Sequence, residues 1–251
     1  AGVQAWLPQQ GRGFAVGPLR IRIVPGATLF ELSSGGEKNG GRFPPYRDLG
    51  YLAAKNAGPD FKLGSVGAGL GASTQNLKGG IGSASARMES GHIVGAIAAV
   101  NAAGRVTLGE EGHFFASAFE QNDEFGGRGF PKTQPTIATA LKGDERQNTT
   151  IALLATDAVL TKAQAKRLAV MAGAGFAMAI HPVFTPLDGD AVFVAATGRK
   201  PLDNSVLGLA RLGAIAAQCL ARAIARGVYE ASSLPFPGAL PSWKGRYGRS
   251  G

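Results

Sequence analysis

The stretch that decides the fold reads Gln147-Asn148-Thr149-Thr150-Ile151-Ala152-Leu153-Leu154-Ala155-Thr156-Asp157. A long polar segment ends at Asn148, and the following residues are apolar and of the kinds that favour strands. We therefore expect a strand over about residues 149–156 that begins directly after a loop. Thr149 stands where the loop becomes the strand, with Asn148 immediately before it.

Thr149 carries a chemical possibility besides its strand propensity. If the Asn148–Thr149 bond were cut, Thr149 would have both a hydroxyl and a free α-amine, which together form a nucleophile with its own base. An α-amine titrates near pH ~8, so much of it is neutral at working pH. Two other interpretations stay open: a Thr-rich strand start, and a glycosylation sequon at residues 148–150. The local pattern alone favours the strand start.

The composition limits the possible classes. The chain has 251 residues, of which 45% are hydrophobic, enough for one large domain or two small ones with a sizeable core. A single cysteine, Cys219, excludes an internal disulfide framework and suits a reducing compartment. The three histidines, His92, His113 and His181, lie far apart, and no C-x-x-C or H-E-x-x-H occurs, so we expect neither a metal site nor a cofactor.

The charge and hydropathy patterns bear on nucleic-acid binding, membrane insertion and cellular location. The net charge is +9, but the basic residues are scattered and not interleaved with aromatics, so we expect no nucleic-acid partner. No window of ~18 apolar residues without charge occurs, so we expect no membrane span and a cytoplasmic protein. The chain starts without Met or a basic segment, and we expect an N-terminal part of the natural protein to be missing. Residues 244–249 are expected to form a solvated tail.

Apolar runs and turn residues predict the order of elements. We expect strands at 19–24, 27–32, 81–88, 92–100, 149–156 and 191–196, and helices at about 47–57, 161–180 and 205–229. A capping box at Thr161 opens the second helix. In the glycine-rich stretch 63–72 we expect backbone crowded against a site or a strand. Residues 109–147 are expected to be an exposed connector. The order predicts one α/β domain with sheets covered by helices.

The last expected helix has an apolar face and a polar face. Cys219 lies on the apolar stripe and is expected to be buried and inert. Arg211, Gln218, Arg222 and Arg226 share the opposite face, which we expect to be solvated.

The catalytic motifs that the sequence lacks narrow the choice of catalytic residues. The sequence has no G-x-S-x-G elbow and no obvious pairing of His with Ser or Cys, so the remaining hydrolase option is a nucleophile with its own base, Thr149. Amide hydrolysis also needs donors for the oxyanion and groups that orient the amine. Lys78, Asn101, Asp188 and Asp190 are candidates. Taken singly, each is better explained as a surface charge, a turn residue or part of a tight turn.

Several motifs taken together change this balance. They are Val24-Pro25-Gly26-Ala27, Pro45-Tyr46-Arg47-Asp48-Leu49-Gly50, residues 64–82 around Lys78, Asn101, Asn148-Thr149-Thr150-Ile151, Ala155-Thr156-Asp157-Ala158, Asp188-Gly189-Asp190 and Val192-Phe193. With these motifs the chain resembles the self-processing amidases that include the β-aminopeptidases, the L-aminopeptidase/D-esterase and the nylon-oligomer (6-aminohexanoate-oligomer) hydrolase. The resemblance covers most of the chain.

The resemblance implies a fold and an assembly. The implied fold is α/β, a four-layer α-β-β-α sandwich forming a single domain over residues 1–251. Self-cleavage at Asn148–Thr149 would give an α chain of residues 1–148 and a β chain of residues 149–251. The αβ units would assemble into homo-oligomers, with a tetramer favoured.

The resemblance also implies roles for individual residues. Thr149 would be the nucleophile released from Asn148. Lys78 and Asn101 would line the site, assist cleavage and hold the oxyanion. Asp188 and Asp190 would orient and polarise the Thr149 amine and hydroxyl.

Within the family, Thr after Asn together with Asp-Gly-Asp favours the nylon-oligomer hydrolase. Two departures are Phe30, which stands where that hydrolase has Tyr, and the missing N-terminal segment. The predicted function is an autoprocessed hydrolase of small linear amides such as 6-aminohexanoate oligomers. The alternatives are an aminopeptidase acting on small or β-peptides, and an unprocessed, inactive binding protein.

Overall fold

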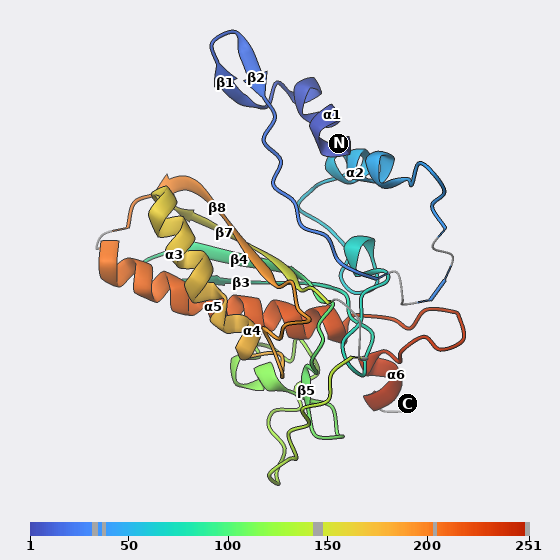
Figure 1. Cartoon of the computed structure of the whole chain (residues 1–251). Helices are drawn as coiled ribbons and strands as arrows, with labels where there is room; N and C mark the ends of the chain where they lie inside the picture. The colour runs from blue at the N-terminus through green and yellow to red at the C-terminus, as the bar shows by residue number, and fades with distance from the viewer. Residues whose placement is uncertain (32–34, 37–38, 143–147, 203–204, 249–251) are drawn as a thin grey trace. The chain divides into compact units, whose positions relative to one another are not determined.

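The structure is a computed structural model that describes residues 1–31, 35–36, 39–142, 148–202 and 205–248 (Figure 1). It forms two compact units. The first comprises Ala1–Thr28 and Gly36–Lys62, and the second comprises Leu29–Gly35 and Leu63–Gly251. All of the candidate site residues belong to the second unit.

The first unit contains two helices, a 3₁₀ turn and a hairpin. Its elements are α1 (Gly2–Trp6), η1 (Leu7–Gln10), β1 (Phe14–Val16), β2 (Leu19–Ile21) and α2 (Tyr46–Lys55). The predicted helix at 47–57 is confirmed as α2. The predicted strand at 19–24 ends early, and the described part of 27–32 forms no strand, so that prediction is wrong. Pro25 lacks the N–H that a ladder would require there.

The second unit is built on a four-stranded sheet. Its strands are β3 (Ile81–Arg87), β4 (Ile93–Ala99), β7 (Ile151–Ala158) and β8 (Ala191–Lys200), in the order β3-β4-β7-β8 (Figure 1). β3 and β4 pair antiparallel, as do β4 and β7, while β7 and β8 run parallel. All four predicted strands are confirmed. Because β7 and β8 are parallel neighbours, the loops that lead into them meet at the same end of the sheet.

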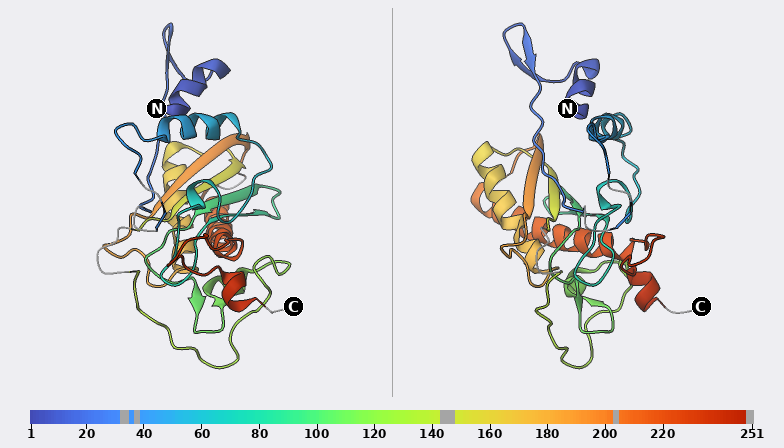
Figure 2. Two further views of the ribbon diagram at one scale, coloured as in Figure 1. Left: turned by 90° about the vertical axis from the view of Figure 1, so that its right-hand side faces the viewer. Right: turned by 45° about the vertical axis from the view of Figure 1, so that its right-hand side comes forward.

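Helices cover this sheet (Figures 1 and 2). They are α3 (Lys162–Ala172), α4 (Ala174–Ala177) and α5 (Ser205–Tyr229); α5 packs on β3 and β4, and α3 packs on β8 and α5. The capping box is confirmed, since the Thr161 hydroxyl accepts the Gln164 amide and the Gln164 side chain accepts the Thr161 amide. Val206–Tyr229 has the length and hydropathy of a membrane span, but most of it is buried against the sheet like a core helix.

Helix α5 lies unusually close to the sheet because glycines face it. A Cβ at Gly82 would lie 1.8 Å from the carbonyl oxygen of Ala223, so no larger residue fits there. The glycine-rich stretch is crowded in the same way: a Cβ at Gly64 would lie 2.1 Å from the Glu230 carbonyl oxygen. The expectation of crowded backbone there is therefore confirmed.

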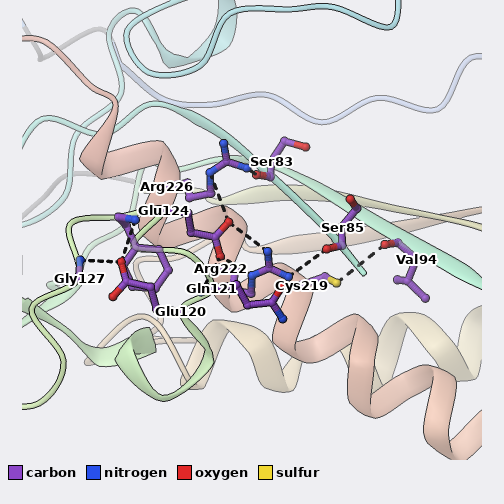
Figure 3. A network of polar contacts seen from close by, with 11 residues as sticks. Ser83, Ser85, Val94, Glu120, Gln121, Glu124, Gly127, Cys219, Arg222 and Arg226 are labelled. Carbon is purple, nitrogen blue, oxygen red and sulfur yellow. Dashed lines mark hydrogen bonds and ion pairs between the residues drawn. The ribbon is translucent and has the colours of Figure 1, made fainter. Parts of the chain in front are cut away.

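The polar face of α5 corrects one prediction (Figure 3). Arg222 is only 6% exposed, and its guanidinium donates to both carboxylate oxygens of Glu124, at 2.5 and 3.0 Å, and to the Ser85 carbonyl at 3.0 Å. Arg226 also approaches Glu124, at 3.7 Å. Only the first half of this face is solvated, because the segment that contains Glu124 folds over the second half. Cys219 is buried as predicted, and burial raises the pKa of its thiol to about 11.

The expected connector and tail also fold back onto the core. Within 107–119 lie β5 (Thr107–Leu108), β6 (His113–Phe114) and η3 (Phe115–Phe119), and α6 (Trp243–Tyr247) is the last element of the described chain. The Phe114 ring packs against Phe125 at 5.2 Å and stacks on Trp243 at 5.6 Å between ring centroids. The prediction of an exposed connector is therefore wrong at Phe114 and Phe125, whereas Lys244, Gly245, Arg246 and Gly248 of the expected tail are exposed as predicted. Burial of three large rings stabilises both segments.

Candidate active site

The loops before β7 and β8 meet in a short parallel bridge. Asn148 pairs with Asp188, and the Asn148 amide donates to the Leu187 carbonyl at 2.8 Å. In return, the Gly189 amide donates to the Asn148 carbonyl oxygen at 2.7 Å. This pairing extends the β7–β8 ladder backwards by a few residues. It brings Asn148 and Thr149 against the Asp-Gly-Asp turn.

Thr149 is 9% exposed and is held through both its amide and its hydroxyl. Its hydroxyl donates to the Asn148 carbonyl oxygen at 2.6 Å, and its amide donates to the Asn101 carbonyl oxygen at 2.9 Å. A Cβ at Gly189 would lie 2.9 Å from the Thr149 Oγ1. The hydroxyl therefore lies between the Asn148 carbonyl group and Gly189, where any larger residue would approach it closely.

The two carboxylates bind backbone around the nucleophile candidate. Asp190 Oδ1 accepts the Thr150 amide at 2.7 Å. Burial raises the pKa of Asp190 to about 6; the nearby Asp188 raises it further, while backbone N–H groups of Thr150 and Phe184 oppose the rise. A carboxyl group with this pKa changes its protonation state close to neutral pH, as acid–base groups in active sites do.

Asp188 has a different set of partners. Its Oδ1 accepts the Ala103 amide at 3.1 Å, and its Oδ2 accepts the amide and hydroxyl of Thr185 at 3.1 and 2.7 Å. These bonds tie the start of β8 to the segment that follows β4. Asp188 is therefore fixed in position by contacts with two separate parts of the chain.

Asn101, at the end of β4, is fully buried and connects the parts of the site. Its backbone carbonyl receives the Thr149 amide. Its side-chain Oδ1 accepts the Ser73 amide at 3.1 Å and the Lys142 Nζ at 2.9 Å, and its Nδ2 donates to the Phe30 carbonyl at 3.0 Å. Phe30, the departure from the family pattern, thus contacts Asn101 through its backbone.

Lys78 is joined to this network through the glycine-rich loop and Ser73. Its ammonium donates to the carbonyl oxygens of Gly69, Ala72 and Gly79, each at 2.7 Å. These three bonds occupy all of its donors. Burial lowers the pKa of Lys78 to about 8; Glu31 opposes this fall, and Lys142 adds to it. In the intact chain Lys78 holds the glycine-rich loop, which connects to Asn101 through Ser73.

A cleft of about 350 Å³ opens beside Lys78 and Lys142. It is lined by Gly35, Gly71, Ala72, Ser73, Gln75, Lys78, Leu141, Lys142, Leu234, Phe236, Pro237, Gly238, Ala239 and Leu240. Lys142 was missed by the sequence analysis, because a single lysine in a polar segment carries no distinguishing pattern. Across the described ranges, no three His, Cys, Asp or Glu side chains gather closely enough to hold a metal ion.

This arrangement defines a class of protein. Thr149 lies just before a central strand, its hydroxyl donates to the carbonyl oxygen of the preceding residue at 2.6 Å, and the Asp-Gly-Asp turn before the adjacent parallel strand lies beside it. That is the arrangement of an N-terminal-nucleophile amide hydrolase. The chain belongs to peptidase family S58, which matches residues 2–239.

Relatives in sequence agree with this assignment. An uncharacterized aminopeptidase of Mycobacterium tuberculosis (strain ATCC 25618 / H37Rv) is 39% identical over 264 residues, covering 96% of this chain and 75% of the relative. Another, from Mycobacterium leprae (strain TN), is 38% identical over 268 residues, covering 95% and 72%.

Solved structures show the same fold. The PH0078 protein from Pyrococcus horikoshii OT3 is 27% identical with a TM-score of 0.55, covering 75% of this chain and 50% of that one. A Burkholderia sp. β-aminopeptidase (24%, TM-score 0.55) covers 82% and 57%. The L-aminopeptidase D-Ala-esterase/amidase from Ochrobactrum anthropi (20%, TM-score 0.55), described as a variant of the Ntn hydrolase fold, covers 77% and 52%. The chain thus spans about half the length of these structures, and the prediction of an α/β sandwich is confirmed.

Proposed function

We propose that this chain is the precursor of a self-processing amide hydrolase with Thr149 as its nucleophile. Cleavage at Asn148–Thr149 would give fragments 1–148 and 149–251. One observation carries the proposal: the Asn148 carbonyl oxygen accepts the Thr149 hydroxyl at 2.6 Å and the Gly189 amide at 2.7 Å. The reacting hydroxyl and a donor for the developing oxyanion are thus both within hydrogen-bond distance of the scissile carbonyl oxygen.

Self-cleavage would proceed in two balanced steps. Thr149 Oγ1 attacks the Asn148 carbonyl carbon, negative charge develops on the carbonyl oxygen, and the Gly189 N–H stabilises it. The C–N bond then breaks: an ester forms on Oγ1, and the proton lost by the hydroxyl ends on the departing nitrogen. Water hydrolyses this ester and leaves Asn148 with a carboxylate and Thr149 with a free amine and hydroxyl.

Turnover would use the freed amine as the base for the same hydroxyl. The Asn101 carbonyl, which accepts the Thr149 amide at 2.9 Å, would then accept a hydrogen bond from the α-amine and orient it. Asp190 and Asp188 would hold the surrounding backbone and supply negative charge. Oγ1 attacks the substrate amide, the amine product leaves, and water hydrolyses the acyl-enzyme.

For the substrate we propose short linear amides, with 6-aminohexanoate oligomers as the leading class. Thr after Asn and the Asp-Gly-Asp turn support this choice. Release of N-terminal residues from small peptides is the second candidate, and the aminopeptidase names of the sequence relatives favour it. Assembly of processed units into homo-oligomers, with tetramers favoured, is part of the proposal and is checked by light scattering.

Intact-mass analysis tests the nucleophile. Freshly folded protein is expected to yield masses for residues 1–148 and 149–251. Thr149→Ala should leave one intact chain, while Thr149→Ser, which keeps the hydroxyl, should still be cut. A cut at another bond, or amidase activity that survives Thr149→Ala, would contradict the assignment.

Product analysis on blocked substrates tests the substrate class. A 6-aminohexanoate oligomer with an acetylated amine is incubated with processed protein, and Thr149→Ala serves as the control. Internal cleavage of the blocked oligomer supports the leading class. No cleavage of it, together with turnover of the same oligomer with a free amine or of free-amine peptides, supports the aminopeptidase.

A further inference from the structure

Lys142 is a buried cation that the proposed chemistry does not use. It lies seven positions before Thr149 in the sequence and is only 6% exposed. Its ammonium donates to Asn101 Oδ1 at 2.9 Å and to the Ser73 carbonyl at 3.3 Å. Burying an ammonium group is costly unless it is paired or hydrogen-bonded, so these contacts identify a built position and not a surface charge.

The contacts of Lys142 converge on the segment that follows β4. Besides the Asn101 side chain, Lys142 contacts Ala103, because its backbone amide donates to the Ala103 carbonyl at 2.9 Å. The same segment holds the reacting groups: the Asn101 carbonyl accepts the Thr149 amide at 2.9 Å, and the Ala103 amide donates to Asp188 at 3.1 Å. Lys142 therefore hydrogen-bonds to residues 101 and 103, the same two residues that contact Thr149 and Asp188.

We propose that Lys142 is a positioning residue for self-cleavage: it fixes the Asn101 side chain and the 101–103 segment, and through them the Thr149 amide and the Asp188 carboxylate. This inference rests on the proposed function. Without the ammonium, the Asn101 side chain is held, among the described residues, only by the Ser73 amide and the Phe30 carbonyl, and its backbone carbonyl can then shift away from the Thr149 amide. A displacement of about 1 Å at a reacting group is enough to slow a reaction ~100-fold.

The cleft offers a direct test by chemical rescue. Lys142 lines the cleft of about 350 Å³, so Lys142→Ala leaves a space that is continuous with it. Propylammonium has the carbon chain and charge of the deleted atoms, and propanol has nearly the same shape without the charge. Cell-free synthesis followed by a time course on a denaturing gel gives the rate at which the two fragments form. Lys132→Ala, an exposed lysine of the same segment, is the matched control.

We expect Lys142→Ala to slow fragment formation about 10- to 100-fold, the range that corresponds to loss of one hydrogen bond to a charged group. Propylammonium should restore the rate and propanol should not, while Lys132→Ala should match the parent. Lys142→Met, which keeps most of the side-chain volume, replaces the alanine variant if circular dichroism shows that the latter does not fold.

Two results overturn the inference. One is a Lys142 variant that is cut at the parental rate. The other is a slow variant that is folded and as heat-stable as the parent but gains nothing from propylammonium, since the ammonium would then not be the positioning group. If the parent chain itself is never cut at Asn148–Thr149, the proposed function fails and this inference fails with it, an outcome visible in the first lane of the same gel.

Discussion

Asp190→Asn should raise stability while it removes activity, a combination that distinguishes a catalytic carboxylate from a structural one. The pKa of Asp190 is raised from 3.8 to about 6, with burial as the first cause. The folded protein thus binds the proton more tightly than the unfolded chain does. The contribution of Asp190 to stability is complete below pH ~4 and is lost as the pH rises through about 6. The difference corresponds to roughly 3 kcal/mol at most.

The measurement compares urea unfolding of Thr149→Ala with that of Thr149→Ala/Asp190→Asn, so that both chains stay uncut. Above pH ~6 the double variant should be more stable by up to roughly 3 kcal/mol, and the advantage should shrink towards pH ~4, because its Asn carries no charge to desolvate. The Asn oxygen can still accept the Thr150 amide. Asp157→Asn is the control, since the Asp157 carboxylate likewise accepts a backbone amide, that of Ile93 at 2.9 Å.

In the chain that keeps Thr149, Asp190→Asn should slow self-cleavage and turnover by about 10²–10⁴-fold. The reasoning is refuted if Asp190→Asn is less stable than its parent at pH 7, or if the stability difference does not change between pH 4 and pH 6. Full turnover in the variant would show that the carboxylate is not part of the chemistry.

Three further predictions concern other contacts. Gly189→Ala should slow self-cleavage without unfolding the chain, because its Cβ would lie 2.9 Å from Thr149 Oγ1; a gel time course beside circular dichroism checks this, and parental cleavage would contradict it. Glu124→Gln should destabilise the protein by about 3–5 kcal/mol in urea unfolding, because it leaves the buried Arg222 without its counter-charge; a loss below ~1 kcal/mol would mean that water screens the pair. The fragments 1–148 and 149–251 should elute together in gel filtration and separate only in denaturant; separation in native buffer would contradict the shared sheet described below.

Much of the sheet could be predicted because its strands are rich in apolar residues, although β3 also contains Ser83, Ser85 and Arg87. The segments that became β3, β4, β7, β8 and α5 each show a clear period or a continuous apolar stretch. The cluster of Phe114, Phe125 and Trp243 could not be predicted, because single aromatics in polar surroundings have no periodicity. Their burial depends on tertiary contacts between segments more than a hundred residues apart.

The sequence predicted the meeting of Thr149 with the Asp-Gly-Asp turn, but it did not predict the position of Lys78. Thr149 and the Asp-Gly-Asp turn precede two strands joined by a helix, and such strands run parallel, so their starts lie at the same end of the sheet. The position of Lys78 could not be deduced in this way. Its partners are backbone carbonyls, which leave no trace in side-chain composition, and the intact chain places it on the glycine-rich loop and not on Thr149.

The place of the proposed cut explains why cleavage need not destroy the fold. β3 and β4 belong to residues 1–148 and β7 and β8 to residues 149–251, and β4 pairs with β7 over six residues, from Val94–Thr156 to Ala99–Ile151. Helix α5 of the second fragment packs on β3 and β4 of the first. The buried Arg222–Glu124 pair also joins the two fragments. Cutting one peptide bond at the end of this sheet therefore breaks none of these contacts. What it changes is local: the Thr149 nitrogen becomes an amine, held against the Asn101 carbonyl that already accepts the Thr149 N–H hydrogen bond in the intact chain.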